Sequence, residues 1–566
     1  MKKYSAKSTE GVTLLDHLLF HRGIKSEAET EKFLNPDYEK HLHNPFEMKD
    51  MEKVVERTLK AFRDNQRIVI FSDYDTDGIP AAVALHDFFK KIGFTNFTNY
   101  IPHRHDEGFG LNLDAVEQFG KDGVKLLMTI DCGTGDVEPI KKATDLGIDV
   151  IITDHHLPHG ELPKAFAILN PKQEDCSYPD KNLCGAGVVF KLIQALVSKL
   201  PVEGLQVKIP PTGWEKWLLD MVGIATLSDM VPLTGENRVF AYYGMAVLRK
   251  SPRVGLMKLL NKLKVNQRNL NEDDVGFTIG PRINAASRMG VPMDAFQLLA
   301  TTDEIEADHY AEHLNKINDE RKGIVAALAK EVKKIIRERY EEKAKQVMVI
   351  GNPLWRPALL GLVANVCATD YQCPVFLWGR DGDNIIKGSC RSGESANLVE
   401  LMSKTLPGTF LQFGGHAFSG GFSVSNEKIH NLETELNRVY ELVEISAEGE
   451  VSFEVDREIS LDEANWNTYK TIEKLAPFGT GNPKPLFLFK DVVPKDVRHF
   501  GKEKNHLELV FEKNDGKKLS ALAFFKKSED WGKEIIAGQP LNLVATFEKS
   551  MFKNFPELRL RIVDVC

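Results

Sequence analysis

Short apolar runs that end directly in an acidic or histidine-bearing turn constrain the fold of this chain more than any other feature. Runs of this kind are typical of buried strands, and open parallel sheets hold their ligands at the carboxyl ends of their strands. Up to about residue 195 the runs alternate with amphipathic segments, which predicts an α/β fold with a parallel sheet. The runs and their turns are Ile68–Phe71 before Asp73–Gly78, Leu126–Ile130 before Asp131–Gly133, and Val150–Thr153 before Asp154–His156.

The first turn, Asp73-Tyr74-Asp75-Thr76-Asp77-Gly78, places three carboxylates within five residues. Their mutual repulsion at the rim of a core favours neutralisation by cations. Oxygen ligands with one or two imidazoles suit Mg²⁺ or Mn²⁺, whereas a zinc site would more often use cysteine. Taken alone, the motif is also compatible with a solvated turn. A calcium loop would need glutamate at its twelfth position, where the chain has Ala84.

A fourth turn, Ser228-Asp229, follows a predicted helix over Trp214–Leu227. Four such turns in matching positions favour one metal site over four unrelated solvated turns. The sequence therefore predicts a site for divalent cations at the edge of the sheet.

Length and charge restrict the function classes. The chain has 566 residues, 42% of them hydrophobic, which is enough for three or four packed domains. Its 73 basic and 81 acidic residues give a net charge of −8, which argues against a passive nucleic-acid coat protein. An enzyme with its basic groups gathered in one groove remains compatible.

Cysteine usage and hydropathy indicate the compartment. The seven cysteines are odd in number and contain no Cys-x-x-Cys pair, which favours reduced thiols in a cytoplasm. The amino terminus lacks an apolar signal core, and no apolar stretch approaches eighteen residues. We expect a cytoplasmic protein with no membrane association.

Asp154-His155-His156 and the turns around it resemble the DHH phosphoesterase superfamily, and within it the RecJ family of bacterial exonucleases. The resemblance extends over roughly residues 45 to 560 and includes motifs that distinguish this family from shorter relatives. These motifs are Ala225–Leu233, Gly280–Arg288, Gly388–Ser392, Gly414–Gly421 and Pro477–Pro483.

The segment pattern and the resemblance together predict five parts. Thr301-Thr302-Asp303-Glu304 supplies a capping box for a long amphipathic helix that would span roughly 60 Å and bridge two domains. The predicted parts are a polar lead-in (1–50), a parallel-sheet DHH catalytic domain (51–300), the connecting helix (301–345), a second α/β, DHH-associated domain (346–445) and a C-terminal OB-fold β-barrel (446–566).

The predicted barrel mixes aromatic and basic residues. Such a mixture is expected of a surface that stacks bases and follows the backbone of a single strand. The alternative is that the phenylalanines are core residues and the lysines are solvated. The residues concerned are Phe524, Phe525, Phe547, Phe552, Phe555, Lys526, Lys527, Lys549 and Lys553.

Cleavage of a phosphodiester at neutral pH is served by two cations close together. We predict two Mn²⁺ or Mg²⁺ ions, with Asp131 as the bridge that the resemblance implies. Asp154 is expected to orient neighbouring groups, and the resemblance implies that His156 faces the scissile phosphate, unless it only makes structural hydrogen bonds. The predicted ligands are Asp73, Asp75, Asp77, Asp131, His155 and Asp229, although relatives often have histidine at the position of Asp73.

Guanidinium groups match phosphate geometry, so arginines in these motifs are candidates for holding the substrate. Each of them could instead form an interdomain salt bridge, and the glycine cluster could be a tight connection only. The candidates are Arg104, Arg282, Asn284, Arg288, Arg391, Ser392, Gly415 and His416.

The resemblance implies a 5′→3′ exonuclease that degrades single-stranded DNA in recombination and repair. It further implies single-strand-binding protein and a helicase as partners, and we expect a monomer. Two other functions stay open: hydrolysis of cyclic dinucleotides or very short RNA, and a scaffold without activity. A barrel-like carboxyl region argues against the first, and filled ligand positions argue against the second.

Overall fold

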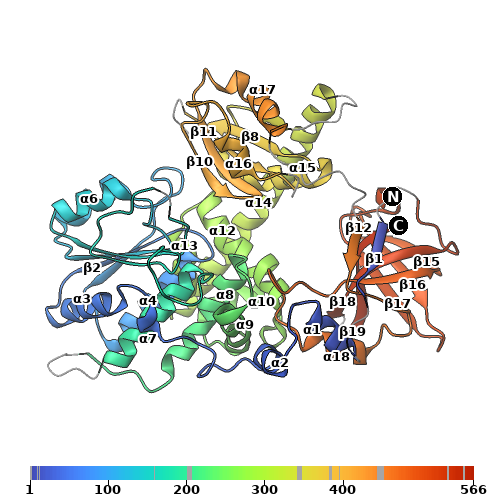
Figure 1. Ribbon diagram of the computed structural model, residues 1–566, viewed down its shortest axis with the longest axis horizontal. Coiled ribbons are helices and arrows are strands. Elements are labelled where there is room, and N and C mark those ends of the chain that lie inside the picture. The colour runs from blue at the N-terminus through green and yellow to red at the C-terminus, as the bar shows by residue number, and fades with distance from the viewer. Residues whose placement is uncertain are drawn as a thin grey trace.

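The computed structural model shows three bodies, and one long helix joins the first of them to the second (Figure 1). The structure describes residues 3–8, 11, 13–158, 160–200, 207–340, 347–380, 385–393, 396–442, 452–531, 534–551 and 555–566. None of the described helices is long and apolar enough to cross a bilayer.

The first body contains a five-stranded parallel sheet in the order β3-β2-β4-β5-β6. Three of its strands, β2, β4 and β5, consist almost entirely of buried apolar residues, as the short apolar runs predict. Ser72 pairs with Ile130, and Ile130 pairs with Thr153, so three strands end at one edge. The strands are β2 (Ile68–Ser72), β3 (Phe97–Tyr100), β4 (Leu126–Ile130), β5 (Asp149–Thr153) and β6 (Ala167–Leu169).

Helices cover both faces of this sheet, because alternate residues of each strand point to opposite sides. Ile70 and Met128 belong to the larger core, while Val69 and Leu127 belong to a separate core on the other face. The larger core is covered by α3 (Met51–Arg63), α4 (Gly78–Ile92), α7 (Gly185–Lys199) and α8 (Leu219–Ser228), and the other by α5 (Leu113–Lys121) and α6 (Val137–Asp145).

The helix predicted over Trp214–Leu227 has two parts, a 3-10 turn η2 (Trp214–Leu218) and then α8, which ends at Ser228. Asp229 is therefore the first residue after the helix, as predicted. Further helices complete the body: η1 (Pro45–Glu47), α9 (Gly235–Leu248), α10 (Val254–Lys262), η3 (Gln267–Asn269), α11 (Glu272–Asp274), the π-helix η4 (Val275–Ile279), α12 (Gly280–Met289) and α13 (Met293–Ala300).

The long connecting helix is α14 (Glu304–Arg339), 36 residues or about 54 Å at 1.5 Å per residue. Its cap is Asp303, whose carboxylate accepts hydrogen bonds from the amides of Ile305 and Glu306. Ala311 and Leu314 pack in the first body, whereas Val332 and Ile336 pack in the second. The helix thus bridges two domains, as its length predicts.

The second body is a mixed five-stranded sheet in the order β10-β11-β9-β8-β7, with only β7 and β8 parallel. The glycine cluster Gly414–Gly421, predicted as a turn, is mostly strand: β10 and β11 form a hairpin with Ala417-Phe418 at its tip. The elements are β7 (Met348–Gly351), α15 (Pro357–Tyr371), β8 (Val375–Arg380), β9 (Ile386–Arg391), α16 (Leu398–Ser403), β10 (Gln412–His416), β11 (Ser419–Val424) and α17 (Ile429–Tyr440).

The third body is a seven-stranded sheet in the order β13-β14-β18-β19-β17-β16-β15 around one apolar core. Most pairs are antiparallel, and inward residues alternate with outward ones in β16. The elements are β13 (Arg457–Glu458), α18 (Trp466–Glu473), β14 (Phe487–Val492), β15 (Asp496–Phe500), β16 (His506–Glu512), β17 (Lys518–Ala523), η5 (Ser528–Trp531), β18 (Leu541–Ser550) and β19 (Glu557–Val565).

The lead-in up to Leu34 packs on the third body, which the sequence does not indicate, whereas Tyr38 and Met48 belong to the core of the first body. Strand β1 (Lys3–Ala6) pairs in parallel with β12 (Ser452–Val455). Helix α1 (Leu14–Phe20) contributes the buried Leu18 and Leu19 to the core of the third body, and α2 (Glu27–Leu34) follows. The two ends of the chain are therefore parts of one domain.

Arg238 in α9 joins the first body to the third. Its buried guanidinium donates to the carbonyls of Leu475, Ala476 and Pro477, at distances of 2.9 to 3.2 Å, and to that of Phe33 at 3.1 Å. The amide of Leu233 also donates to Thr480 at 2.8 Å. The Pro477–Pro483 motif is thus a docking element between domains.

Replacing Arg238 by methionine is expected to weaken this docking by about 3 kcal/mol, because several buried carbonyls would lose a charged donor. Calorimetry should then show the third body unfolding at a lower temperature than the first. Arg249→Met, at the residue that caps the end of the same helix and with one side-chain bond, to the carbonyl of Leu270, is the matched control and should leave the transitions together. Unchanged unfolding in Arg238→Met would contradict the docking role.

Candidate metal centre

The predicted ligands converge at the carboxyl edge of the parallel sheet. Asp73 follows β2 directly, Asp131 follows β4, and His155 lies two residues beyond β5. Asp229 joins them from the end of α8. Asp131 has φ +59, a left-handed conformation that is costly for most residues but tolerated by aspartate and asparagine. Strain of this kind is concentrated at functional sites.

His155 lies at the middle of the carboxylates. Its Nε2 is 3.2 Å from Asp131 Oδ1 and 3.7 Å from both Asp77 Oδ2 and Asp229 Oδ2. The side chains form three sets, and within each set the possible ligand atoms lie within 4.8 Å of one another. The sets are Asp77, His155 and Asp229; Asp73, Asp75 and Asp131; and Asp131, His155 and His156. Asp131 and His155 each belong to two of these sets, and Asp131 has two carboxylate oxygens with which to contribute to both.

The amino terminus of α7 fixes the carboxylate of Asp77. The amides of Gly185 and Ala186 donate to its two oxygens at 2.6 and 2.8 Å. A Cβ on Gly185 would lie 2.7 Å from Asp131 Cβ, so only glycine fits between the helix and that ligand. Sequence reasoning missed Gly185, because one glycine within Cys184-Gly185-Ala186-Gly187 carries no local signal for this contact.

Asp154 faces the backbone and a histidine. Its carboxylate accepts hydrogen bonds from the amides of Thr134 at 3.0 Å and His155 at 2.7 Å, and Oδ1 is 2.8 Å from His156 Nδ1. Burial acts to raise the pKa of Asp154, but the hydrogen bonds and charge of His156 outweigh it and lower that pKa. Burial lowers and Asp154 raises the pKa of His156, which rises to about 9.

The carboxylates of the cluster are hard to ionise together. Burial, and then repulsion by Asp75, raises the pKa of Asp77 to about 7. Burial, and then the charges of Asp77 and Asp75, raises the pKa of Asp229 to about 8. Burial and neighbouring carboxylates also raise the pKa values of Asp73 and Asp131 well above the usual range. A cation between these groups would reverse each shift.

Two observations fit this site to divalent cations. The Oδ1 atoms of Asp73 and Asp131 are buried and accept no hydrogen bond from any residue that the structure describes. Buried carboxylate oxygens without a donor are costly unless they bind a metal ion. The set of five aspartates and one imidazole, with no thiolate, suits Mg²⁺ or Mn²⁺.

The raised pKa values predict how stability depends on pH. Carboxyls whose pKa is raised on folding stabilise the folded state below about pH 4 and lose this contribution as pH rises through 7 and 8. In EDTA, the unfolding temperature should therefore fall by several degrees between pH 6 and pH 8.5. Added Mg²⁺ should raise that temperature more at pH 8.5 than at pH 6. An equal rise in unfolding temperature with Mg²⁺ at both pH values would contradict the raised pKa values of these carboxyls.

Four arginines, three from α12, α14 and β9 and one from the loop after β3, gather beside the carboxylates. Burial, and then the charges of Arg104, Arg321 and Arg391, lowers the pKa of Arg288 to about 9. Arg288 donates to the carbonyl of Ala358 in the second body at 2.7 Å, so the cluster lies at the junction of two domains. None of the four forms an ion pair with a carboxylate of the described residues, which leaves the salt-bridge alternative unsupported.

The other candidates lie in varied surroundings. Arg282 donates to the carbonyl of Thr278 at 2.7 Å and to Asn315 at 3.1 Å, and so ties α12 to α14. Asn284 is half-buried on α12. Ser392 is buried directly after β9, and Gly415 in β10 has φ +137. His416 ends β10, and its side chain lies outside the described structure. Arg321 was missed, since it lies within a charged helical run.

The aromatic residues of the third body divide between core and surface. Phe547 is buried, whereas Phe525 is 78% exposed and Phe555 is 55% exposed. The guanidinium of Arg561 lies 4.0 Å from the ring centre of Phe524. Phe552 and Lys553 lie outside the described residues. The core interpretation therefore fits Phe547, and the exposed Phe525 and Phe555 are compatible with a surface that stacks bases.

Known proteins share this organisation. Residues 67–226 match the DHH family, N-terminal domain; residues 344–444 match the DHHA1 domain; and residues 455–564 match the RecJ OB domain. The chain is 33% identical over 556 residues to the single-stranded-DNA-specific exonuclease RecJ of Bacillus subtilis, covering 97% of this chain and 67% of that protein. It is 32% identical to RecJ of Haemophilus influenzae, covering 90% and 89%.

The chain belongs to the RecJ family. The fold agrees with that of RecJ from Thermus thermophilus in complex with Mn²⁺, with a TM-score of 0.79 at 24% identity over 97% of this chain and 75% of that one. A second RecJ structure, bound to manganese, is 28% identical with a TM-score of 0.58 over 70% of this chain and 95% of that one. The predicted α/β fold with a C-terminal OB domain is confirmed.

Proposed function

We propose that this RecJ-family protein is a metal-dependent exonuclease that degrades single-stranded DNA in the 5′→3′ direction. The observation that carries the proposal is the cluster of Asp77, Asp131, His155 and Asp229 beside four arginines. The names of the relatives support the substrate, because those proteins are single-stranded-DNA-specific exonucleases.

In the proposed mechanism, Asp73, Asp75, Asp77, Asp131, His155 and Asp229 hold two Mn²⁺ or Mg²⁺ ions. Bound divalent ions lower the pKa of water and neutralise charge on phosphoryl oxygens. Asp131 would contribute its carboxylate to both ions, a role that its two oxygens and its membership of two ligand sets support. The amides at the start of α7 keep both oxygens of Asp77 in place.

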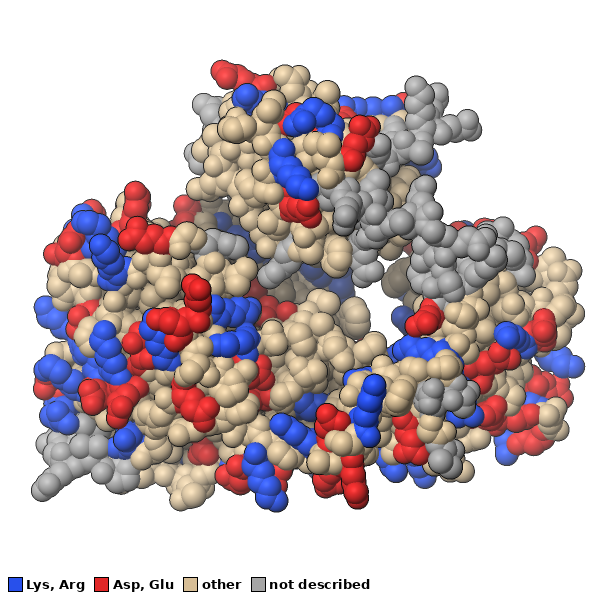
Figure 2. Space-filling model, viewed as in Figure 1, with Lys and Arg blue, Asp and Glu red and all other residues tan. Residues whose placement is uncertain are grey.

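His156 and the arginines are proposed to bind the phosphates. Because Asp154 engages Nδ1 of His156, the other ring nitrogen, Nε2, is left to donate to a phosphate oxygen. Arg104, Arg288 and Arg391 are drawn from the first and second bodies, so a phosphate held by them must lie between two domains. Figure 2 shows an opening among the three bodies. A passage between domains favours one strand over a duplex.

Direction of digestion separates this proposal from its alternatives. A strand of about 30 nucleotides, labelled at either end, should release the 5′ label first when Mn²⁺ is supplied, and the same strand in a blunt duplex should persist. Release of the 3′ label first would contradict the direction, and cleavage of dinucleotides alone would favour the short-substrate enzyme. Inactivity with both Mg²⁺ and Mn²⁺ would favour the scaffold.

The cellular setting is proposed on the same basis. We propose that the protein works in recombination and repair, where a helicase and single-strand-binding protein supply its strands. We also propose that it is a cytoplasmic monomer.

A further inference from the structure

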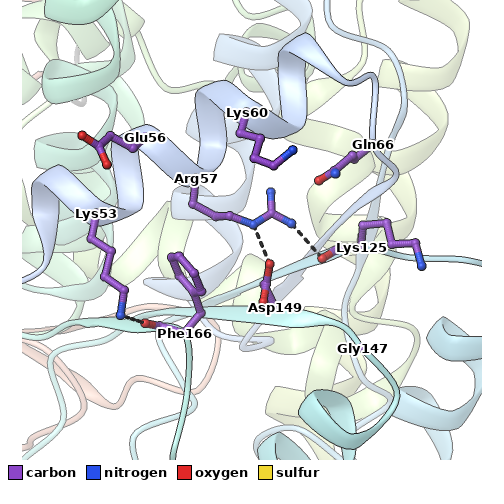
Figure 3. Close-up of a pocket in the computed structure, with 9 residues that line it drawn as sticks. All are labelled: Lys53, Glu56, Arg57, Lys60, Gln66, Lys125, Gly147, Asp149 and Phe166. Carbon is purple, nitrogen blue, oxygen red and sulfur yellow. Dashed lines mark hydrogen bonds and ion pairs between the residues drawn. The ribbon is translucent and has the colours of Figure 1, made fainter.

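A cavity of about 460 Å³ lies on the first body, at the sheet edge opposite the metal centre (Figure 3). Its position follows from its lining: Lys125 precedes β4, Asp149 begins β5, and Phe166 precedes β6. All three lie at the amino-terminal ends of strands, whereas the metal ligands follow the carboxyl-terminal ends. Helix α3 supplies the opposite wall with Lys53, Glu56, Arg57 and Lys60.

Arg57 is the buried centre of this cavity. The residue is 8% exposed, Nε donates to Asp149 at 2.6 Å, and Nη2 donates to the carbonyl of Lys125 at 3.1 Å. These two bonds fix the plane of the guanidinium. The third nitrogen, Nη1, is buried and donates to none of the described residues. A buried cationic donor without an acceptor is costly, so its surroundings favour an external acceptor.

Neighbouring side chains point toward the same place. Figure 3 shows Lys60 and Gln66 directed toward the guanidinium from the side opposite Asp149. Gln66 Oε1 is buried and accepts no hydrogen bond from the described residues, and rotation of this amide would present its NH₂ group instead. Two cations and an amide thus converge on one point.

The charge of the lining favours an anion. The lining contains four cationic residues, Lys53, Arg57, Lys60 and Lys125, and two acidic ones, Glu56 and Asp149, and the ammonium of Lys53 donates to the carbonyl of Phe166. Asp149 is engaged by Arg57, and Asp64, the residue that caps the end of α3, pairs with Lys60 from outside the lining, so four cationic groups stand against three carboxylates. The free edge of the guanidinium therefore keeps an excess of positive charge around it.

We propose that this cavity binds the phosphate group of a small molecule, with Arg57 Nη1 and Lys60 as the principal donors. A guanidinium edge beside an ammonium suits phosphate, which accepts several charge-assisted hydrogen bonds at once. Inorganic phosphate and a mononucleotide share this chemistry, and the cavity is large enough for either. The site is separate from the metal centre and does not depend on the proposed function.

Isothermal titration of the Mg²⁺-loaded protein with inorganic phosphate, and separately with thymidine monophosphate, tests this site. Two variants retain Arg57 and its structural bonds: Lys60→Gln removes a donor, and Gln66→Glu places a carboxylate beside Nη1. Each should weaken one class of phosphate sites by about ten-fold or more, since a charged hydrogen bond contributes roughly 1.5 to 3 kcal/mol. Tighter binding of the nucleotide than of phosphate would identify a mononucleotide as the ligand, and equal binding would identify phosphate itself.

Lys141→Gln is the matched control, because Lys141 also pairs with an aspartate four residues later on an exposed helix, α6, but does not line the cavity. It should bind phosphate as the unaltered protein does. Unchanged stoichiometry and affinity in both Lys60→Gln and Gln66→Glu would overturn the proposal, as would equal weakening in Lys141→Gln. Hydrolysis of single-stranded DNA, measured in parallel, reports on the proposed function alone.

Discussion

Asp131→Asn is expected to reduce phosphodiester hydrolysis by about three orders of magnitude or more while making the metal-free protein more stable. Asp131 belongs to two sets of ligand atoms, so its loss should weaken binding at both. Asparagine tolerates φ +59, as aspartate does, so the backbone need not move. Removing one of several buried, repelling carboxylates should increase the free energy of unfolding in EDTA at pH 8, because burial and the neighbouring carboxylates raise the pKa of Asp131.

Calorimetry in EDTA and in Mg²⁺ measures the second part of this expectation. The unaltered protein should gain stability from Mg²⁺, and Asp131→Asn should gain much less. Asp136→Asn, at a half-buried carboxyl whose pKa is also raised and that no ligand set includes, is the control for loss of a charge and should retain the Mg²⁺ effect. Hydrolysis that survives Asp131→Asn at the normal rate would remove the proposed mechanism.

Gly185→Ala is expected to lower the rate of hydrolysis by about 100-fold with little loss of overall stability. The new Cβ would lie 2.7 Å from Asp131 Cβ and Oδ1, and either this ligand or the start of α7 must shift. A shift of α7 would also move the amides that hold Asp77. Misplacement of a catalytic group by about 1 Å can cost two orders of magnitude in rate.

Gly187→Ala is the matched control, since it lies on the same helix and its Cβ would meet Leu183 Cβ at 3.3 Å, away from the ligands. Both substitutions add the same methyl group to α7. The rate should therefore fall in Gly185→Ala and change little in Gly187→Ala. Similar rates in the two variants would show that the contact between Gly185 and Asp131 is not required.

Local patterns were enough to predict which acidic turns and which histidine meet at the edge of the sheet, and which elements carry them. The apolar runs Ile68–Phe71 and Leu126–Ile130 are strands β2 and β4, and the acidic turns follow them because parallel strands end at a common edge. The long helix was predicted from its apolar spacing, but it begins at Glu304 with Asp303 as its cap, in place of the predicted capping box from Thr301, and it ends at Arg339. These features depend on residues close together in the sequence.

Contacts between distant segments could not be predicted in the same way. Gly185 meets Asp131, Arg238 meets the carbonyls of residues 475–477, and β1 pairs with β12 across most of the chain. Arg282 and Arg288 lie on one helix in one motif, yet only Arg288 has Arg104 and Arg391 as neighbours.

The sequence by itself determined the strands, the acidic turns and the chemical character of the metal ligands, because periodicity and side-chain type act locally. Only the tertiary structure decided which arginines gather beside those ligands, which glycine must remain small, and where Arg57 is left with a free donor. The physical reason is that packing and burial set these relations, and both depend on residues brought together only when the chain folds.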